Sequence, residues 1–129
     1  MKQINVLLAD NCSEFTKLFS DYLSLNPNIN IVGITADGAE TVELLRQTRP
    51  DVLLLDLVMP RVDGLEVLRR ISSEKERPKV LVVSALGSEE VTRRALELGA
   101  DFFFIKPLNL EAVLSKILEI RKLKMRRNS

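Results

Sequence analysis

Short apolar runs alternate along the chain with longer stretches in which apolar residues recur every three or four positions. The short runs show little alternation of apolar and polar residues, which is typical of strands buried on both faces. The second run is less apolar than the others, which favours an edge position in the sheet. We expect strands at residues 4–9, 29–32, 52–55, 80–83 and 102–105.

The longer stretches predict amphipathic helices, one after each strand. Residues that favour helix ends flank them: Ser13, Asp37, Asp63 and Asn109 at N-termini, and Gly99 at a C-terminus. A strand followed by a helix, five times over, predicts an α/β fold with one parallel sheet, helices on both faces and right-handed crossovers. The predicted apolar helix faces comprise Phe15, Leu18, Phe19, Tyr22 and Leu23; Val42, Leu44 and Leu45; Leu65, Leu68 and Ile71; Val91, Ala95, Leu96 and Leu98; and Leu110, Val113, Leu114, Ile117 and Leu118.

The composition is that of one soluble globular domain. The chain has 129 residues, of which 46% are apolar, and its formal net charge of +1 argues against nucleic-acid binding by bulk charge. No apolar run reaches membrane length and the N-terminus is unlike a signal peptide, so we expect a cytoplasmic protein without membrane contact. Hydrophobic periodicity is lost from Arg121 onwards. We therefore assign residues 1–122 to the domain and residues 123–129 to a basic tail or the start of a linker.

Two residue types are scarce enough to exclude classes of chemistry. A single cysteine, Cys12, excludes an internal disulfide and a cysteine-rich zinc site, and we expect its side chain to be a small buried one rather than a redox sensor. The chain has no histidine, which removes the commonest general base and most transition-metal sites.

Four of the five predicted strands end on, or run directly into, a polar residue able to do chemistry: Asp10, Asp56, Ser84 and Lys106. Polar residues also belong in loops, so one such ending would mean little. All four stand at C-terminal strand ends, however, and in an open parallel sheet this edge is where ligands bind. We therefore interpret the four as one site.

The residue types in this site suit phosphoryl transfer. Asp10 and Asp56 offer the oxygen ligands that Mg²⁺ prefers, Lys106 offers a point charge for phosphate oxygens, and Ser84 offers a hydroxyl donor. Phosphoryl transfer depends mainly on positioning and charge neutralisation. The carboxylate of Asp56 would be the nucleophile and would become an acyl phosphate.

These residues resemble the pattern of the receiver domains of two-component response regulators. The resemblance rests on Asp10, the segment from Asp56 to Gly64, the segment from Val82 to Ala85, and the pair Lys106-Pro107, in order and spacing over essentially the whole chain. It implies a flavodoxin-like fold with sheet order 2-1-3-4-5, and a cis peptide bond before Pro107.

The resemblance also implies roles for single residues. Asp56 would accept a phosphoryl group from a histidine kinase or a phosphotransfer protein, assisted by Ser84 and Lys106, and the chain would catalyse only its own phosphorylation and slow dephosphorylation. Ser84 and Phe103 would change position in the phosphorylated state. The expected Mg²⁺ ligands are Asp10, Asn11, Asp56 and the backbone carbonyl of Val58.

The chain departs from the family pattern at the end of the first strand. The family has two adjacent acids there, and this chain has Asp10 followed by Asn11. Because Asn11 brings no charge, we expect weaker Mg²⁺ binding rather than a dead site. Val58 and Leu86 stand at positions that influence dephosphorylation in relatives, and both are apolar. Since neither can orient a water molecule, we expect slow hydrolysis of the phosphorylated form.

The resemblance places signal output on the face formed by the fourth helix, the strand at residues 102–105 and the helix that follows, through which many relatives form homodimers. Residues 99–107 and the neighbouring helices most resemble the receiver of a master regulator of sporulation. This implies a transcription factor that contacts DNA only through an output domain absent from these 129 residues.

Two other functions stay open at this point. A receiver that binds partners without being phosphorylated is supported by Asn11 alone. A flavin or nucleotide enzyme on a similar fold is disfavoured, because the sequence has neither a Gly-x-Gly-x-x-Gly turn after the first strand nor a Gly-Lys-Ser/Thr phosphate loop.

Overall fold

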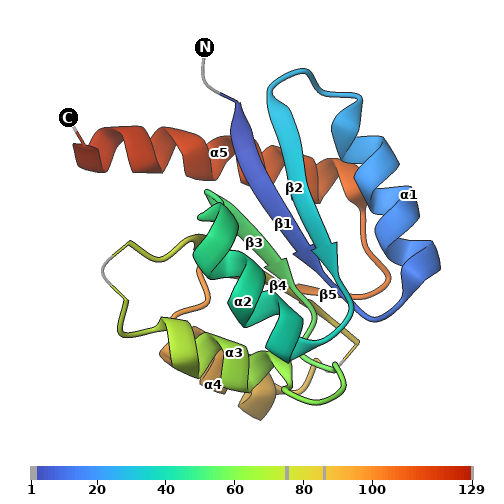
Figure 1. The fold of residues 1–129 in the computed structure, drawn as a ribbon, viewed down its shortest axis with the longest axis vertical. Coiled ribbons are helices and arrows are strands. Elements are labelled where there is room, and N and C mark those ends of the chain that lie inside the picture. Colours follow the sequence, from blue (N-terminus) through green and yellow to red (C-terminus); the bar gives the residue numbers. More distant parts are fainter. Residues whose placement is uncertain (1–2, 75, 86, 129) are drawn as a thin grey trace.

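A computed structural model describes the backbone of residues 3–74, 76–85 and 87–128, and the side chains of this part up to Ile120. In these residues strands and helices alternate without exception (Figure 1). The elements are β1 (Ile4–Ala9), α1 (Ser13–Ser24), β2 (Ile29–Thr35), α2 (Gly38–Thr48), β3 (Val52–Leu55), α3 (Gly64–Ile71), β4 (Lys79–Ser84), α4 (Glu89–Glu97), β5 (Phe102–Ile105) and α5 (Leu110–Asn128).

The strands form one parallel sheet in the order β2-β1-β3-β4-β5, which confirms the predicted fold and the edge position of β2. The register aligns the carboxyl ends of the inner strands, because Ala9 pairs with Leu55 and Leu55 pairs with Val82. Residues that follow these strands must therefore meet at one edge of the sheet.

Helices cover both faces of the sheet, and the core has two layers (Figure 1). Side chains from α2, α3 and α4 pack on one face, and side chains from α1 and α5 pack on the other. The inner strand β3 alternates between the layers, with Leu53 in the first and Leu54 in the second. All four residues of β3 are buried, which is why its sequence is an unbroken apolar run.

Helix ends follow the predicted capping residues in most cases. The side chains of Asp37, Asp63 and Asn109 accept hydrogen bonds from the backbone N–H groups three residues later, at 2.8, 2.9 and 3.2 Å. Gly99 follows α4 with a φ of 109°, as expected of a glycine that ends a helix. The prediction for Ser13 was wrong: α1 begins at Ser13 itself, and Cys12 at the capping position makes no side-chain cap.

Several side chains predicted to be buried are exposed. Leu18 lies on α1 with 61% of its surface accessible, and Leu96 and Phe102 are also exposed. Cys12 is exposed too, so the prediction of a small buried cysteine was wrong. The reason for Cys12 is local: its backbone N–H donates to Asp10 Oδ1 at 2.9 Å, which holds this residue in the turn between β1 and α1, outside the core.

The last helix continues further than the predicted domain. Its backbone is helical to Asn128, through the residues that we assigned to a tail or linker. The side chains of the basic stretch at 121–129 lie outside the described residues. The boundary at residue 122 stays a prediction.

Candidate functional site

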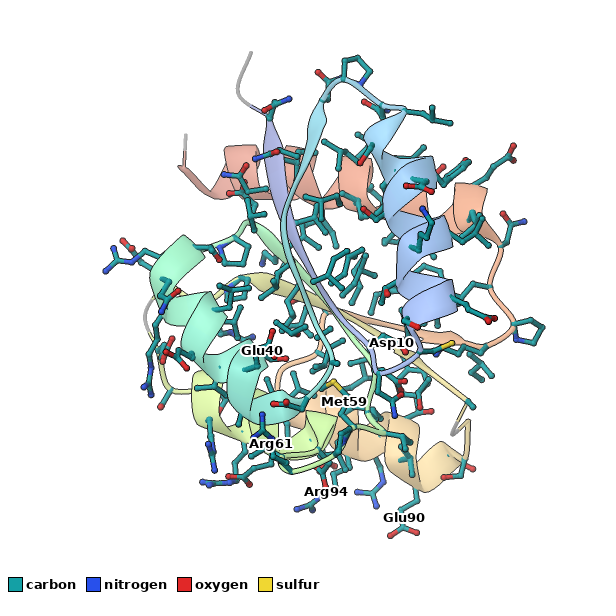
Figure 2. The ribbon with its side chains drawn as sticks, turned by 45° about the vertical axis from the view of Figure 1, so that its right-hand side comes forward. Asp10, Glu40, Met59, Arg61, Glu90 and Arg94 are labelled. Carbon is teal, nitrogen blue, oxygen red and sulfur yellow. The ribbon has the colours of Figure 1, made fainter. Side chains whose placement is uncertain are left out.

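The carboxyl ends of β1 and β3 place two acids side by side. The Asp56 N–H donates to the Ala9 carbonyl at 2.8 Å, and the Asp10 N–H donates to the Thr35 carbonyl at 3.0 Å, so both backbones continue the sheet. Asp10 is only 5% exposed and Asp56 only 6%. Figure 2 shows Asp10 at the end of β1, on the same end of the molecule as Met59 and Arg61 from the loop that follows β3.

Lys106 connects the two acids. Its Nζ lies 2.7 Å from Asp10 Oδ2 and 3.4 Å from Asp56 Oδ2. The Lys106 N–H donates to the Ser84 carbonyl at 2.9 Å, which fixes the end of β5 against the end of β4. The peptide bond between Lys106 and Pro107 is cis, as the sequence led us to expect. Three of the four predicted side chains, those of Asp10, Asp56 and Lys106, therefore contact one another.

Ser84 and Phe103 lie on the neighbouring strands β4 and β5, where Ser84 pairs with Ile105 and Phe103 pairs with Val82. Ser84 is the last residue of β4 and is fully buried. Phe103 on β5 is partly buried and packs against the core layer of α2, α3 and α4. Their change of position on phosphorylation stays a prediction, as do their roles in the site.

Burial and neighbouring charges act in opposite directions on Asp56. Burial raises its pKa, with a further contribution from the Asp10 charge, and this outweighs the Val58 N–H and the Lys106 charge, which lower it. The Val58 N–H donates to Asp56 Oδ1 at 3.1 Å. Burial thus disfavours the charged form of Asp56, and a bound cation would make this form more favourable.

The opposite balance holds for Lys106. Burial disfavours its charged form, but the hydrogen bond and the charge of Asp10, together with the charge of Asp56, raise the pKa of Lys106 above its usual value. Lys106 is therefore a fixed positive charge at neutral pH.

Asp10 and Asp56 offer the kind of oxygen ligands that Mg²⁺ takes in proteins. Within the described residues, no group of three or more His, Cys, Asp or Glu side chains is placed to hold a metal ion. Asp10 and Asp56 are nevertheless both buried and both contact the Lys106 ammonium group. Mg²⁺ is commonly held by one or two carboxylates, with water completing its shell. Asn11 directly follows Asp10 in the chain, and the Val58 N–H donates to Asp56 Oδ1, so both residues are next to the two acids. These residues fit the ion.

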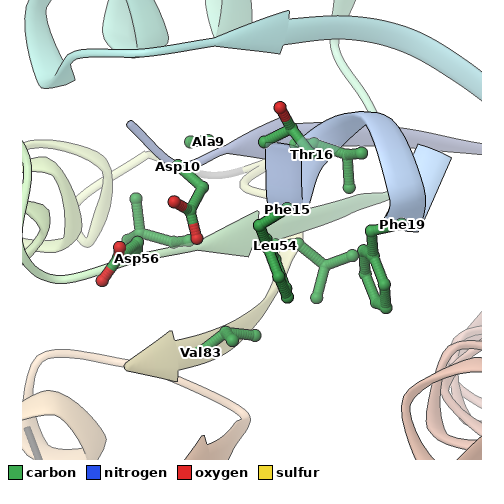
Figure 3. A pocket seen from close by; sticks show the side chains of 10 residues that line it. Ala9, Asp10, Phe15, Thr16, Phe19, Leu54, Asp56 and Val83 are labelled. Carbon is green, nitrogen blue, oxygen red and sulfur yellow. The ribbon is translucent and has the colours of Figure 1, made fainter. Parts of the chain in front are cut away.

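A small cavity of about 10 Å³ lies next to the two acids (Figure 3). Asp10 and Asp56 stand at one end of it, and Phe15 and Phe19 of α1 line its side. A cavity of this size has room for about one water molecule. The cavity is thus an extension of the site into the core and not a separate binding pocket.

The loop after β3 is fastened to the start of α2, which the sequence reasoning missed. Arg61 Nη2 lies 2.5 Å from Asp37 Oδ2, and Arg61 has a φ of 67°. The pKa of Asp37 is lowered by the Glu40 N–H and then by Arg61. Gly38 is required here because a Cβ would lie 1.8 Å from the Val62 carbonyl oxygen. One signal was available: Asp37-Gly38 also follows a strand end, at the same edge of the sheet.

Comparison with known proteins agrees with this geometry. The chain matches the family model of the response regulator receiver domain over residues 6–118, and it belongs to this family. It is similar to the signal receiver domain of the putative response regulator NarL from Mycobacterium tuberculosis, at 31% identity and a TM-score of 0.89 over 95% of this chain and 98% of that one.

Two further structures are similar at the same identity. The response regulator domain of Thermotoga maritima CheB is 31% identical, with a TM-score of 0.83 over 97% of this chain and 98% of that one. The Borrelia burgdorferi CheX-CheY-BeF3-Mg complex contains a chain that is 31% identical, with a TM-score of 0.82 over 92% of this chain and 90% of that one.

The protein is therefore a receiver domain of the two-component response regulators, a class that works in phosphorylation-based signalling. Receiver domains in general are switches rather than enzymes, bind Mg²⁺, and interact with histidine kinases or phosphotransfer proteins. Among the helices of the described residues, none has the length and apolar composition needed to span a bilayer.

Proposed function

We propose that Asp56 is the phosphorylation site of this receiver and that its donor is a histidine kinase or a phosphotransfer protein. The observation that carries the proposal is the position of Lys106, whose ammonium lies within 2.7 Å of Asp10 and 3.4 Å of Asp56. A lysine so placed neutralises charge beside one buried carboxylate, which is what the addition of a phosphoryl group to that carboxylate requires.

The chemical step is a displacement at phosphorus. An oxygen of Asp56 attacks, the bond from phosphorus to the donor nitrogen of a phosphohistidine breaks, and its electron pair returns to the imidazole. The product is an acyl phosphate on Asp56. Lys106 stays beside it as a fixed charge, and the hydroxyl of Ser84, buried at the end of β4, donates a hydrogen bond to the phosphoryl oxygens.

Mg²⁺ belongs to this proposal as the cofactor. Asp10, Asp56, Asn11 and the Val58 carbonyl would hold it. When bound, the ion offsets the negative charge of the carboxylates and of the incoming phosphoryl group. The exposed, apolar side chain of Val58 cannot orient a water molecule, which supports slow dephosphorylation. Leu86, the other residue named for this property, lies outside the described residues.

The output of the switch is proposed on α4, β5 and α5. Leu96, Phe102 and Ile105 are exposed there, which makes this face suited to homodimerisation or to contact with another domain. The resemblance of residues 99–107 to a sporulation regulator supports a role in a phosphorelay that controls transcription. DNA contact would then belong to an output domain outside these 129 residues.

The second candidate function is a receiver that binds partners without phosphorylation. Asn11 favours it, because this residue leaves two carboxylates rather than three beside the proposed metal site. The same residue is compatible with the first function if Mg²⁺ binds weakly.

Incubation with acetyl phosphate over a range of Mg²⁺ concentrations separates the two functions. The first predicts that the intact mass rises by one phosphoryl group, that Asp56→Asn abolishes the gain, and that a high Mg²⁺ concentration is needed. The second predicts no gain at any Mg²⁺ concentration. Ser73→Ala, in the exposed segment after α3, is a matched control that should gain phosphate as the wild type does.

A further inference from the structure

Lys106 has a third neighbour besides the two acids. Its Nζ lies 4.5 Å from the centroid of the Phe15 ring, within the range of an attractive cation–π contact. Phe15 comes from α1, the helix that follows Asp10 in the chain, and its ring lines the cavity beside both acids (Figure 3). The ammonium group is therefore enclosed by two carboxylates and the face of one aromatic ring.

The Phe15 ring is itself held in place. It stacks on Phe19 with 5.4 Å between the ring centroids and 17° between the ring planes. Phe19 is almost completely buried in the core layer of α1 and α5. Because Phe15 rests on a fixed neighbour, it presents a fixed surface to Lys106.

A ring in this position does something that a third carboxylate would not. It attracts the ammonium through its π face, yet it cannot bind Mg²⁺ or repel a phosphoryl group. The ring confines the ammonium without adding negative charge to the place where the phosphoryl group must arrive.

We propose that Phe15 is a positioning residue for phosphoryl transfer, acting by holding the Lys106 ammonium beside Asp56. The inference rests on the proposed phosphorylation of Asp56. The alternative explanation of Phe15 is simple apolar packing between α1 and the sheet, in which case any apolar side chain of similar volume would serve as well.

Three variants of Phe15 and one control variant separate positioning from packing. Phe15→Leu and Phe15→Met keep apolar volume and remove the ring, whereas Phe15→Tyr keeps the ring. The matched control is Tyr22→Leu, which removes a ring from the same helix and the same core layer, and Tyr22 makes no contact with Lys106 among the described contacts. The readout is the maximal rate of phosphorylation by acetyl phosphate at saturating Mg²⁺, determined separately from the acetyl phosphate concentration that gives half of this rate.

We expect Phe15→Leu and Phe15→Met to lower the maximal rate about two- to five-fold, which corresponds to the usual strength of such a contact. Phe15→Tyr should keep the wild-type rate, and Tyr22→Leu should leave it unchanged. The half-saturating concentration should change little, because the ring does not touch the donor. Equal rates for wild type, Phe15→Leu and Phe15→Met would overturn the inference.

Proton NMR provides a readout that does not depend on activity. The methylene protons next to Lys106 Nζ should show upfield ring-current shifts in the wild type and in Phe15→Tyr. Shifts equal to those of an exposed lysine in the wild type would also overturn the inference. A wild type that accepts no phosphate overturns the proposed function itself, whereas a wild type that accepts phosphate as fast as Phe15→Leu overturns only the role of Phe15.

Discussion

At the scale of single residues, the most informative feature is that the Asp56 carboxyl group is buried beside Lys106. Burial raises the pKa of Asp56 above its ordinary value of 3.8. A raised pKa in the folded state means that folding favours the protonated carboxyl. The contribution of the Asp56 carboxyl group to the free energy of unfolding is fully present below pH 3.8. It is lost as the pH rises through the pKa that this group has in the folded state.

Asp56→Asn should therefore stabilise the protein at neutral pH. The amide has no charge to desolvate, and Lys106 keeps Asp10 as its closer partner at 2.7 Å. Urea denaturation at pH 7 should show a higher midpoint for Asp56→Asn, and the difference from wild type should shrink as the pH falls below 3.8. A midpoint at pH 7 below that of the wild type would contradict the assignment of Asp56 as a costly buried charge.

The second residue-scale prediction concerns Asn11. Asn11→Asp adds a carboxylate directly after Asp10 in the chain, and this third negative charge should strengthen Mg²⁺ binding by about tenfold, or ~1.4 kcal/mol. Calorimetric titration with MgCl₂ measures the change directly. Asn30→Asp on β2, at the opposite end of the sheet, controls for the effect of net charge. Equal Mg²⁺ affinities of Asn11→Asp and Asn30→Asp would show that Asn11 does not face the metal.

At the scale of elements, the loop after β3 depends on the start of α2. The Val62 carbonyl packs directly against Gly38, and Arg61 pairs with Asp37. This loop carries Val58, the proposed carbonyl ligand. The structure therefore makes α2 a support for the site, although none of its residues touches Lys106 among the described contacts.

Gly38→Ala tests this support. The new Cβ would meet the Val62 carbonyl oxygen at 1.8 Å, a backbone contact that only a shift of the loop relieves, and overpacking of this kind costs about 1–3 kcal/mol. The control is Gly33→Ala, whose Cβ would meet the end of the flexible Leu44 side chain at 2.5 Å. We expect Gly38→Ala to lower both the free energy of unfolding and the Mg²⁺ affinity, and Gly33→Ala to affect stability alone. Unchanged Mg²⁺ affinity in Gly38→Ala would separate α2 from the site.

The strands could be predicted from the sequence because inner strands buried on both faces read as apolar runs, as β3 does. The meeting of Asp10, Asp56 and Lys106 could be predicted because these residues stand at strand ends that a parallel sheet brings together. In contrast, the exposure of Leu18 and the ring of Phe15 against Lys106 depend on how α1 lies on the sheet. Helical periodicity identifies an apolar face but does not say which of its residues reach the core.

At the scale of the whole molecule, the two core layers share the same sheet. Leu53 and Leu54 are adjacent, yet they pack into opposite layers. Because one strand serves both layers, neither layer can be lost while the other stays folded. We therefore expect one cooperative unfolding transition, as is usual for a domain of this size.

Leu53→Ala tests this cooperativity. Removing a fully buried leucine side chain should cost about 2–5 kcal/mol. The single tyrosine of the chain, Tyr22, packs against the other layer, so its fluorescence reports on α1 and α5. Tyr22 fluorescence and far-ultraviolet circular dichroism should shift to the same lower urea midpoint. Two separate midpoints would mean that the layers unfold independently.

The central claim is that the carboxylate of Asp56 becomes an acyl phosphate, and chemical trapping tests it most directly. Borohydride reduces an aspartyl phosphate to homoserine, and mass spectrometry of the peptides then locates the reduced residue. After treatment with acetyl phosphate and Mg²⁺, the account predicts homoserine at position 56 and at no other aspartate. Homoserine at Asp10 or elsewhere, or none in a protein that has gained a phosphoryl group, would contradict it.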